Sequence, residues 1–246
     1  MTRAGRIAIG GDDRVFVLTG AGISAESGLA TFRGSGGLWE GERVEDVASP
    51  RGWKRDPECV WRFYSERRKA AARAEPNAAH LALAELERRL GERYFLCTQN
   101  VDDLHERAGS RNLVHMHGEL FQSRCDQCAR DAFRDTRLYE SAAEQMQCEC
   151  GGRIRPDIVW FGEVPFHMER IAEELQSCTV MLVIGTSGVV QPAASFVRWA
   201  SECRGNGGAP VRTYYVGLEH PANAAAFTQV FVGSAGALLP KLFRVS

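Results

Sequence analysis

Four cysteines crowd into a short stretch of this 246-residue chain with the spacing of a metal site. Cys125 and Cys128 form a C-x-x-C pair, and Cys148 and Cys150 form a C-x-C pair. Four thiolates in this ribbon-like spacing favour tetrahedral Zn²⁺ in a closed, structural site. Zinc ribbons usually carry C-x-x-C in both pairs, so the alternative is a degenerate site that binds metal weakly or not at all. The glycines at 151 and 152 offer a turn that compensates for the shorter pair.

A glycine-rich turn, Gly20-Ala21-Gly22-Ile23-Ser24, follows an apolar run. Glycines at a strand-to-helix turn let backbone N–H groups approach a pyrophosphate, whose charge the helix N-terminus favours. The alternative is a tight turn with no ligand. Downstream, residues 32–39 combine an arginine, aromatic residues and small residues, which suits a loop that closes over a cofactor.

Polar residues Gln99, Asn100 and Asp102 follow a second apolar run. Loops at the carboxyl ends of parallel strands commonly contact ligands, and amide and carboxylate groups there bind ribose hydroxyls or a carboxamide. Capping of the following turn by Asn100 or Asp102 is the ordinary alternative. Next along the chain, His115 and His117 are expected on one face of a strand. His117, beside a glycine at the strand end, is the better candidate for a base near neutral pH.

Short apolar runs predict the strands that position these residues. Because the runs are apolar throughout, they indicate a parallel sheet buried on both faces. Helical spacing of apolar residues between them predicts an α/β fold with right-handed crossovers. The predicted strands are 14–19, 94–98, 180–184 and 211–216, and the predicted helices are 57–74, 76–90, 171–175 and 193–203. The polar stretch 122–153 breaks this alternation and is interpreted as an inserted module.

The amino-acid composition limits the kinds of partner that the protein is expected to bind. Thirty Lys and Arg against 31 Asp and Glu give a net charge of −1, so no overall basic field attracts nucleic acid or an anionic membrane. No run approaches the roughly 18 apolar residues of a membrane helix, and the N-terminus lacks the pattern of a signal peptide. We therefore expect a cytoplasmic protein, in which clustered thiols bind metal rather than form disulfides.

These motifs appear in the order found in sirtuins, which the chain resembles from Arg14 to about Leu239. The resemblance implies a Rossmann-like parallel sheet with helices on both faces, plus a small inserted zinc-ribbon module, in one catalytic domain. Its large subdomain would span about 10–33, 75–120 and 155–246, and its small subdomain about 34–74 and 121–154. The motifs that carry the resemblance are the first glycine turn, Gln99-Asn100-Val101-Asp102, His117-Gly118, the cysteine pairs, Val159-Trp160-Phe161-Gly162-Glu163 and Gly185-Thr186-Ser187.

The resemblance implies NAD-dependent removal of acyl groups from protein lysines, with nicotinamide, 2′-O-acyl-ADP-ribose and free lysine as products. His117 would be the catalytic base, and one structural Zn²⁺ would bind the four cysteines. Gly217 stands where the family usually carries an asparagine near the adenosine, and it offers only backbone groups. The implied NAD contacts are Gly20, Ala21, Gly22, Ser24, Phe32, Arg33, Trp39, Gln99, Asn100, Val101, Asp102, Gly185, Thr186, Ser187, Gly217, Leu218, Glu219 and Ala235.

The implied partner is an acylated protein or peptide, and we expect a monomer. The peptide would lie as a strand against Val159, Phe161, Gly162 and Glu163, although Val159 to Phe161 alone would suit a core strand. An NAD hydrolase or ADP-ribosyltransferase on the same fold is the nearest alternative. An oxidoreductase and a zinc-ribbon interaction module are more distant ones.

One helix carries a possible determinant of acyl specificity. Tyr64 and Arg67 are three residues apart and share a face with Val60 and Ala71. A guanidinium in apolar surroundings can bind a carboxylate through two parallel hydrogen bonds, with the phenol as a third donor. This Tyr-x-x-Arg pattern resembles the sirtuin branch that removes succinyl and malonyl groups. The alternative is a surface arginine whose stem packs on the helix, among several others there.

Overall fold

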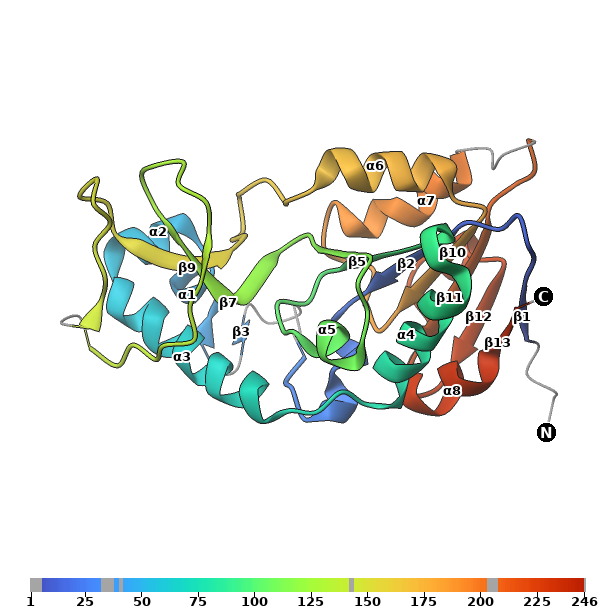
Figure 1. Ribbon diagram of the computed structural model, residues 1–246, viewed down its shortest axis with the longest axis horizontal. Helices are drawn as coiled ribbons and strands as arrows, with labels where there is room; N and C mark the ends of the chain where they lie inside the picture. Colours follow the sequence, from blue (N-terminus) through green and yellow to red (C-terminus); the bar gives the residue numbers. More distant parts are fainter. Residues whose placement is uncertain (1–5, 32–37, 40–41, 142–143, 203–207, 246) are drawn as a thin grey trace.

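A six-stranded parallel sheet forms the centre of the larger part of the molecule (Figure 1). The computed structural model describes residues 6–31, 38–39, 42–141, 144–202 and 208–245, without the side chains of 38 and 39. The strand order is β12-β11-β10-β2-β5-β6. The strands are β2 (Val15–Thr19), β5 (Tyr94–Thr98), β6 (Leu113–His115), β10 (Val180–Ile184), β11 (Arg212–Gly217) and β12 (Gln229–Val232).

Helices cover both faces of this sheet, as predicted (Figure 1). On one face lie α4 (Ala78–Leu90) and α8 (Ala235–Leu242), and on the other lie α6 (Met168–Ser177) and α7 (Phe196–Glu202). Every residue of β2, β5 and β10 is buried, which explains why these strands lack an alternating pattern. At one edge, β1 (Ile7–Ile9) pairs in parallel with β13 (Phe243–Val245) and brings the two ends of the chain together.

The predicted helix boundaries need small corrections. The helix expected at 76–90 begins at Ala78, because the Asn77 side chain accepts a hydrogen bond from the Ala79 N–H and caps it. The helix expected at 171–175 extends over Met168–Ser177. The helix expected from 193 begins as a 3₁₀ turn, Ala193–Ser195, before α7. Other 3₁₀ turns are Ala21–Ile23, Ala25–Ser27, Gly91–Arg93 and Ala224–Ala226.

A second unit lies at the end of the molecule opposite the termini (Figure 1). It contains the antiparallel sheet β8-β7-β9 and its own buried apolar cluster, which includes Trp61 and Trp160. Its strands are β3 (Leu38–Trp39), β4 (Glu42–Arg43), β7 (Gly118–Cys125), β8 (Phe133–Arg134) and β9 (Ile154–Ile158). Its helices are α1 (Val44–Val47), α2 (Pro50–Arg55) and α3 (Pro57–Arg73). The short helix α5 (Leu104–Ala108) connects β5 to β6 of the six-stranded sheet.

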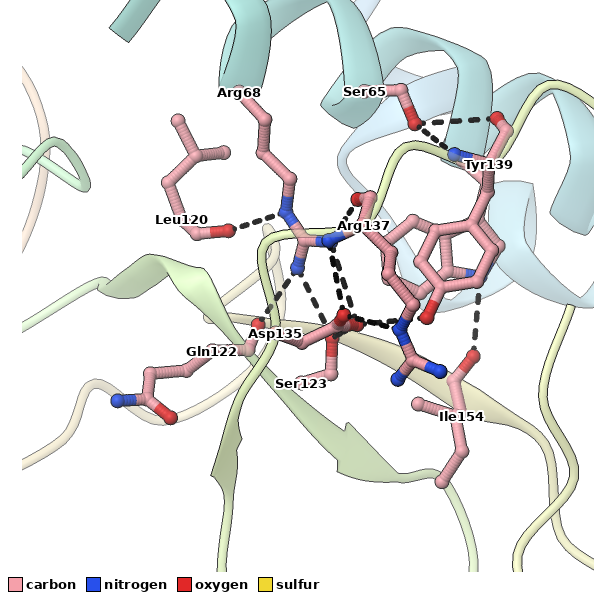
Figure 2. A network of polar contacts seen from close by, with 10 residues as sticks. Ser65, Arg68, Leu120, Gln122, Ser123, Asp135, Arg137, Tyr139 and Ile154 are labelled. Atoms are coloured by element: carbon pink, nitrogen blue, oxygen red, sulfur yellow. Dashed lines mark hydrogen bonds and ion pairs between the residues drawn. The ribbon is translucent and has the colours of Figure 1, made fainter. Parts of the chain in front are cut away.

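A buried polar network fixes α3 to the small sheet (Figure 2). The Arg68 guanidinium, 1% exposed, donates to the Leu120 carbonyl at 2.8 Å and to the Ser123 hydroxyl at 3.1 Å. Its Nη1 lies 3.4 Å from the Asp135 carboxylate, which also accepts hydrogen bonds from Ser123 and Tyr139. Because each charge is paired and hydrogen-bonded, the pair can stay buried. Among the described helices, none has the length and apolar character needed to cross a membrane.

Candidate active site and metal centre

The first glycine turn packs directly against the loop after β10. Gly20 N–H donates to the Ile184 carbonyl at 3.0 Å, and Gly22 N–H donates to the Gly185 carbonyl at 2.7 Å. A Cβ at Gly20 would lie 2.8 Å from the Thr186 Cβ, and one at Gly22 would lie 2.7 Å from the Gly185 oxygen. Close packing of the two loops therefore requires glycine at both positions, whether or not a ligand binds there. The turn opens a short 3₁₀ helix, not the α-helix expected from the sequence, so a helix dipole contributes little there.

Ser24 connects this turn to the loop after β5. Its hydroxyl accepts a hydrogen bond from Asn100 Nδ2 and donates one to Asp102 Oδ2, each at 3.1 Å. All three residues are buried. Burial raises the pKa of Asp102, although hydrogen bonds from the Leu104 N–H and Ser24 oppose this shift. The hydrogen bond from the Leu104 N–H also shows that Asp102 caps the following turn, as the capping alternative predicted. A ligand role for the same side chain stays a prediction.

His80 is a member of this cluster that the sequence analysis missed. Its Nδ1 accepts from the Asn77 N–H at 3.2 Å, so Nε2 carries the proton of the neutral ring. Nε2 faces the Ser24 hydroxyl at 3.5 Å. Burial lowers the pKa of His80 to about 4, which keeps the ring neutral at physiological pH. The available signal was the Asn77-x-x-His80 spacing, typical of a capping box at a helix start.

His115 and His117 do not share a strand, contrary to the prediction. β6 ends at His115, and β7 starts at Gly118, whose φ of +86° makes the sharp turn between them possible. His115 is buried, with Nδ1 2.8 Å from the Asn100 carbonyl and Nε2 2.7 Å from the Glu106 carboxylate. Both partners only accept hydrogen bonds, so both ring nitrogens donate and His115 is an imidazolium. Burial opposes this charge, but Glu106 raises the pKa of His115.

His117 lies beside the loop that holds Asn100 and Asp102. Its Nδ1 is 3.1 Å from the Gln99 carbonyl, so Nδ1 donates and Nε2 is left unprotonated in the neutral ring. Burial lowers the pKa of His117, and the Gln99 bond partly offsets that shift. The result is a neutral imidazole with a basic Nε2 at physiological pH, the state that a general base requires.

The four clustered cysteines converge as expected for a metal centre. Their sulfur atoms all lie within 4.8 Å of one another. Cys125 Sγ is 3.5 Å from Cys150 Sγ, and Cys128 Sγ is 3.7 Å from Cys148 Sγ. Tetrahedral Zn²⁺ with bonds of about 2.3 Å separates its sulfur ligands by about 3.8 Å. The cluster therefore fits zinc with small adjustments.

The two glycines after the C-x-C pair make this convergence possible. Gly151 has a φ of +86°, and its N–H donates to the Cys148 carbonyl at 2.9 Å. A Cβ at Gly152 would lie 2.6 Å from Cys125 Sγ. Only glycine therefore fits at 152 without displacing a thiolate. This arrangement agrees with the compensating turn that the sequence suggested.

The segment expected to bind a peptide is a turn, not a core strand. β9 ends at Ile158, and the Val159 N–H donates to the His117 carbonyl at 2.9 Å. Trp160 is buried, whereas Phe161 is 50% exposed. The Glu163 carboxylate points inward and binds Arg155 through two oxygens, at 2.7 and 3.0 Å. The Glu163 side chain therefore holds the turn and does not face outward, as a direct peptide contact would require.

Tyr64 and Arg67 occupy the face of α3 that the sequence predicted. The Tyr64 hydroxyl is wholly buried and accepts a hydrogen bond of 3.0 Å from Trp160 Nε1, which leaves its own O–H as a donor. Burial raises the pKa of Tyr64 to about 12, so the phenol stays protonated. Arg67 lines a shallow, open hollow together with Asp102 and the apolar residues Leu29, Ala30, Ala70, Ala71 and Leu120. The hollow thus reaches from α3 to the loop after β5.

The remaining predicted contacts lie at the carboxyl ends of β10 and β11. Ser187 is exposed, as are Leu218 and Glu219, while Ala235 is buried at the start of α8. Phe32 and Arg33 lie outside the described residues, as does the side chain of Trp39.

The ring of Tyr215 fills the space into which a side chain at position 217 would project. A Cβ at Gly217 would collide with the Tyr215 hydroxyl, which donates to the Thr186 carbonyl at 3.2 Å. The phenol therefore takes the space that the usual asparagine of the family would need.

Comparison with known proteins agrees with this arrangement. Residues 20–192 match the model of the Sir2 family. The chain belongs to the Sir2 family, the sirtuins. This sirtuin is 48% identical over 233 residues to the NAD-dependent protein deacylase of Shewanella oneidensis, covering 93% of this chain and 92% of the relative. The protein of the same name from Escherichia coli strain K12 is 46% identical over 235 residues, covering 93% and 80%.

Solved structures confirm the predicted fold class. A Sir2 homologue bound to NAD is 40% identical to this sirtuin, with a TM-score of 0.82 and coverage of 94% of this chain and 88% of that one. A Sir2 protein bound to an acetylated peptide is 28% identical, with a TM-score of 0.77 and coverage of 92% and 90%. The parallel sheet with helices on both faces and the four-cysteine module thus belong to a known architecture.

Proposed function

We propose that this sirtuin removes acyl groups from protein lysine side chains in an NAD⁺-dependent reaction that yields nicotinamide, 2′-O-acyl-ADP-ribose and free lysine. The observation that carries this proposal is the state of His117, a neutral imidazole with a basic Nε2 beside the Asn100–Asp102 loop. Relatives named NAD-dependent protein deacylase at 46–48% identity support it.

The polar cluster at the carboxyl ends of β2 and β5 suits a dinucleotide. Asn100 and Asp102 would contact the nicotinamide and its ribose, and Ser24 would hold both side chains in place. Thr186 and Ser187 would contact the cofactor from the neighbouring strand end. The acyl oxygen of the substrate would first displace nicotinamide from C1′ of the ribose. His117 Nε2 would then accept a proton from a ribose hydroxyl, whose oxygen attacks the acyl carbon and so releases the lysine nitrogen.

We propose further that the substrates include acidic acyl groups such as succinyl and malonyl. Arg67 lies in an apolar-lined hollow that also contains Asp102, so a carboxylate bound to Arg67 would sit near the reacting ribose. The Tyr64 O–H would supply a neighbouring donor. A structural Zn²⁺ on Cys125, Cys128, Cys148 and Cys150 would stabilise the second unit and take no part in chemistry.

We also propose how the chain is organised and where it acts. The chain would form one catalytic domain, in which the central sheet and the zinc-bearing unit close around the substrate. It would act in the cytoplasm, where the cysteine ligands stay reduced. Each of the seven cysteines in the described part of the chain is a free thiol.

A peptide panel tests the function. Purified protein is incubated with NAD⁺ and matched acetyl-, succinyl- and malonyl-lysine peptides, and each product is detected by mass. Deacylated peptide and 2′-O-acyl-ADP-ribose in equal amounts are the expected result. Nicotinamide released equally with and without peptide would instead indicate an NAD hydrolase and overturn the proposal.

A further inference from the structure

Arg155 is a buried arginine of β9 whose guanidinium contacts the last residue of that strand and two residues of the turn that follows, Trp160 and Glu163. It is 6% exposed, and its Cζ lies 3.3 Å from the ring centroid of Trp160. Its two terminal nitrogens bind the Glu163 carboxylate at 2.7 and 3.0 Å, and one also donates to the Ile158 carbonyl at 2.8 Å. A planar guanidinium can stack and form a bidentate pair at once, whereas a lysine ammonium cannot.

The same carboxylate closes the turn that presents Phe161. Glu163 Oε2 accepts from the Trp160 N–H at 2.8 Å, and the Glu163 N–H donates to the Trp160 carbonyl at 2.9 Å. Gly162, with a φ of +93°, allows the chain to reverse between them. Arg155 therefore orients the carboxylate that fixes the backbone of the peptide-binding turn.

The indole held by Arg155 also reaches the helix that carries the predicted acyl-recognition residues. Trp160 Nε1 donates to the Tyr64 hydroxyl at 3.0 Å, and both side chains are buried. Since the indole N–H occupies one lone pair of the phenol oxygen, it also fixes the directions in which the Tyr64 O–H can point. A movement of Trp160 would thus change both the backbone of the Trp160–Glu163 turn and the orientation of the Tyr64 hydroxyl.

We propose that Arg155 is a positioning residue that couples peptide binding to acyl recognition. It holds the Trp160–Glu163 turn through Glu163 and holds Tyr64 through the stacked indole of Trp160. This inference rests on the proposed deacylase function, and it adds that the peptide backbone and the acyl group are recognised by one connected unit.

Arg155→Lys tests the coupling, because it keeps the charge but loses the planar fork and the stacking. The matched control is Arg124→Lys, since Arg124 also faces Glu163 but at 3.6 Å and with greater exposure. For each variant, kcat and KM are measured with acetyl- and succinyl-lysine peptides of one sequence. The dissociation constant for ADP-ribose reports whether the nucleotide site remains folded.

We expect Arg155→Lys to raise the peptide KM about tenfold with the acetyl peptide, the effect of losing one charge-assisted hydrogen bond. The rise with the succinyl peptide should be several times larger, because the Tyr64 donor is displaced as well. Binding of ADP-ribose should change less than twofold, and Arg124→Lys should change each KM less than twofold.

An unchanged peptide KM with an equal fall in kcat on both peptides would overturn the inference, because it would indicate only a smaller folded fraction. Should Arg155→Lys fail to bind ADP-ribose, Glu163→Gln tests the same turn and should raise KM on both peptides. Failure of the wild-type protein to deacylate any peptide would refute the proposed function. An absent KM effect in an active protein would refute only the coupling.

Discussion

The Ser24 hydroxyl donates a hydrogen bond of 3.1 Å to the Asp102 carboxylate. Ser24 follows β2 and Asp102 follows β5, and these strands are neighbours in the sheet. Because the same hydroxyl accepts from Asn100, one small side chain holds together the two loops on which the proposed nucleotide site depends.

Replacing His117 with Tyr should give a folded but nearly inactive protein. The tyrosine removes the basic Nε2, and loss of a general base costs about 10²–10⁴-fold in rate. Nicotinamide release with an acetyl peptide measures the effect, and an unchanged melting temperature shows that the fold is intact. Turnover near the wild-type rate would refute the assignment of the base.

Replacing Arg67 with Met should remove most desuccinylation and spare deacetylation. Methionine keeps the apolar stem but cannot bind a carboxylate, so kcat/KM for succinyl peptides should fall about 100-fold, as expected for a lost bidentate pair. Kinetics on matched acetyl and succinyl peptides provide the measurement. Arg62→Met, at an exposed position on the same helix, is the control. Equal losses on both peptides would contradict the role.

The His115–Glu106 pair should make stability depend on pH. The pKa of His115 is raised from 6.5, so its contribution is complete below pH 6.5 and is lost as pH rises through the folded value. The pKa of Glu106 is lowered from 4.5, so its contribution is present above pH 4.5 and is lost as pH falls through the folded value.

Glu106→Gln should therefore lower the free energy of unfolding near pH 6 by about 1–2 kcal/mol, with a smaller loss at pH 9. Urea unfolding at several pH values measures this difference. Glu173→Gln, at an exposed position on α6, serves as the control. A loss that is the same at both pH values would exclude an imidazolium at His115.

Gly152→Ala should weaken zinc binding, because the added methyl group would lie 2.6 Å from Cys125 Sγ. Disturbing the surroundings of a metal ligand typically costs about 10–100-fold in affinity. Competition with a chromogenic chelator measures the affinity, and the matched control is Gly11→Ala, whose methyl group would meet nothing within 4 Å. Wild-type affinity in Gly152→Ala would show that the cysteine cluster is arranged differently.

Asp135→Asn should destabilise the second unit strongly. Burial raises the pKa of Asp135, but hydrogen bonds from Arg137, Ser123 and Tyr139 outweigh it and hold the pKa at about 2. Breaking a buried pair leaves Arg68 uncompensated, so the free energy of unfolding should fall by about 3 kcal/mol. Chemical denaturation measures the loss, with the exposed Glu140→Gln as control. A loss below about 1 kcal/mol would mean that water hydrates the Arg68 guanidinium in place of the lost carboxylate.

Sequence patterns located the buried central strands and the helices that pack one apolar face on them. β2, β5 and β10 were predicted because each is a short, mainly apolar run, and β11 because of its apolar and aromatic residues after Arg212. β6 was predicted only in part, since the strand expected to carry both His115 and His117 ends at His115. β12 was not predicted, since it is only four residues long and begins with Gln229. α8 was missed as well, because Pro240 lies inside it and argues against a helix.

The candidate site shows a similar limit. Cys125 and Cys128 could be paired with the second cysteine pair because zinc spacing is local in sequence. His80 was missed because its partner Ser24 is 56 residues away, and only the fold brings them together. The inward orientation of Glu163 could not be foreseen for a different reason, since it depends on how the turn after β9 folds back towards Arg155.

The Tyr215 phenol and the absent side chain at Gly217 have a consequence for how this sequence can change. Introducing an asparagine at 217 would, by itself, force the phenol out of its place beside Thr186. Shortening Tyr215 alone would leave an unfilled space next to a residue without a Cβ. Substitutions at the two positions should therefore be non-additive, because a side chain at 217 fits only when Tyr215 is shortened at the same time.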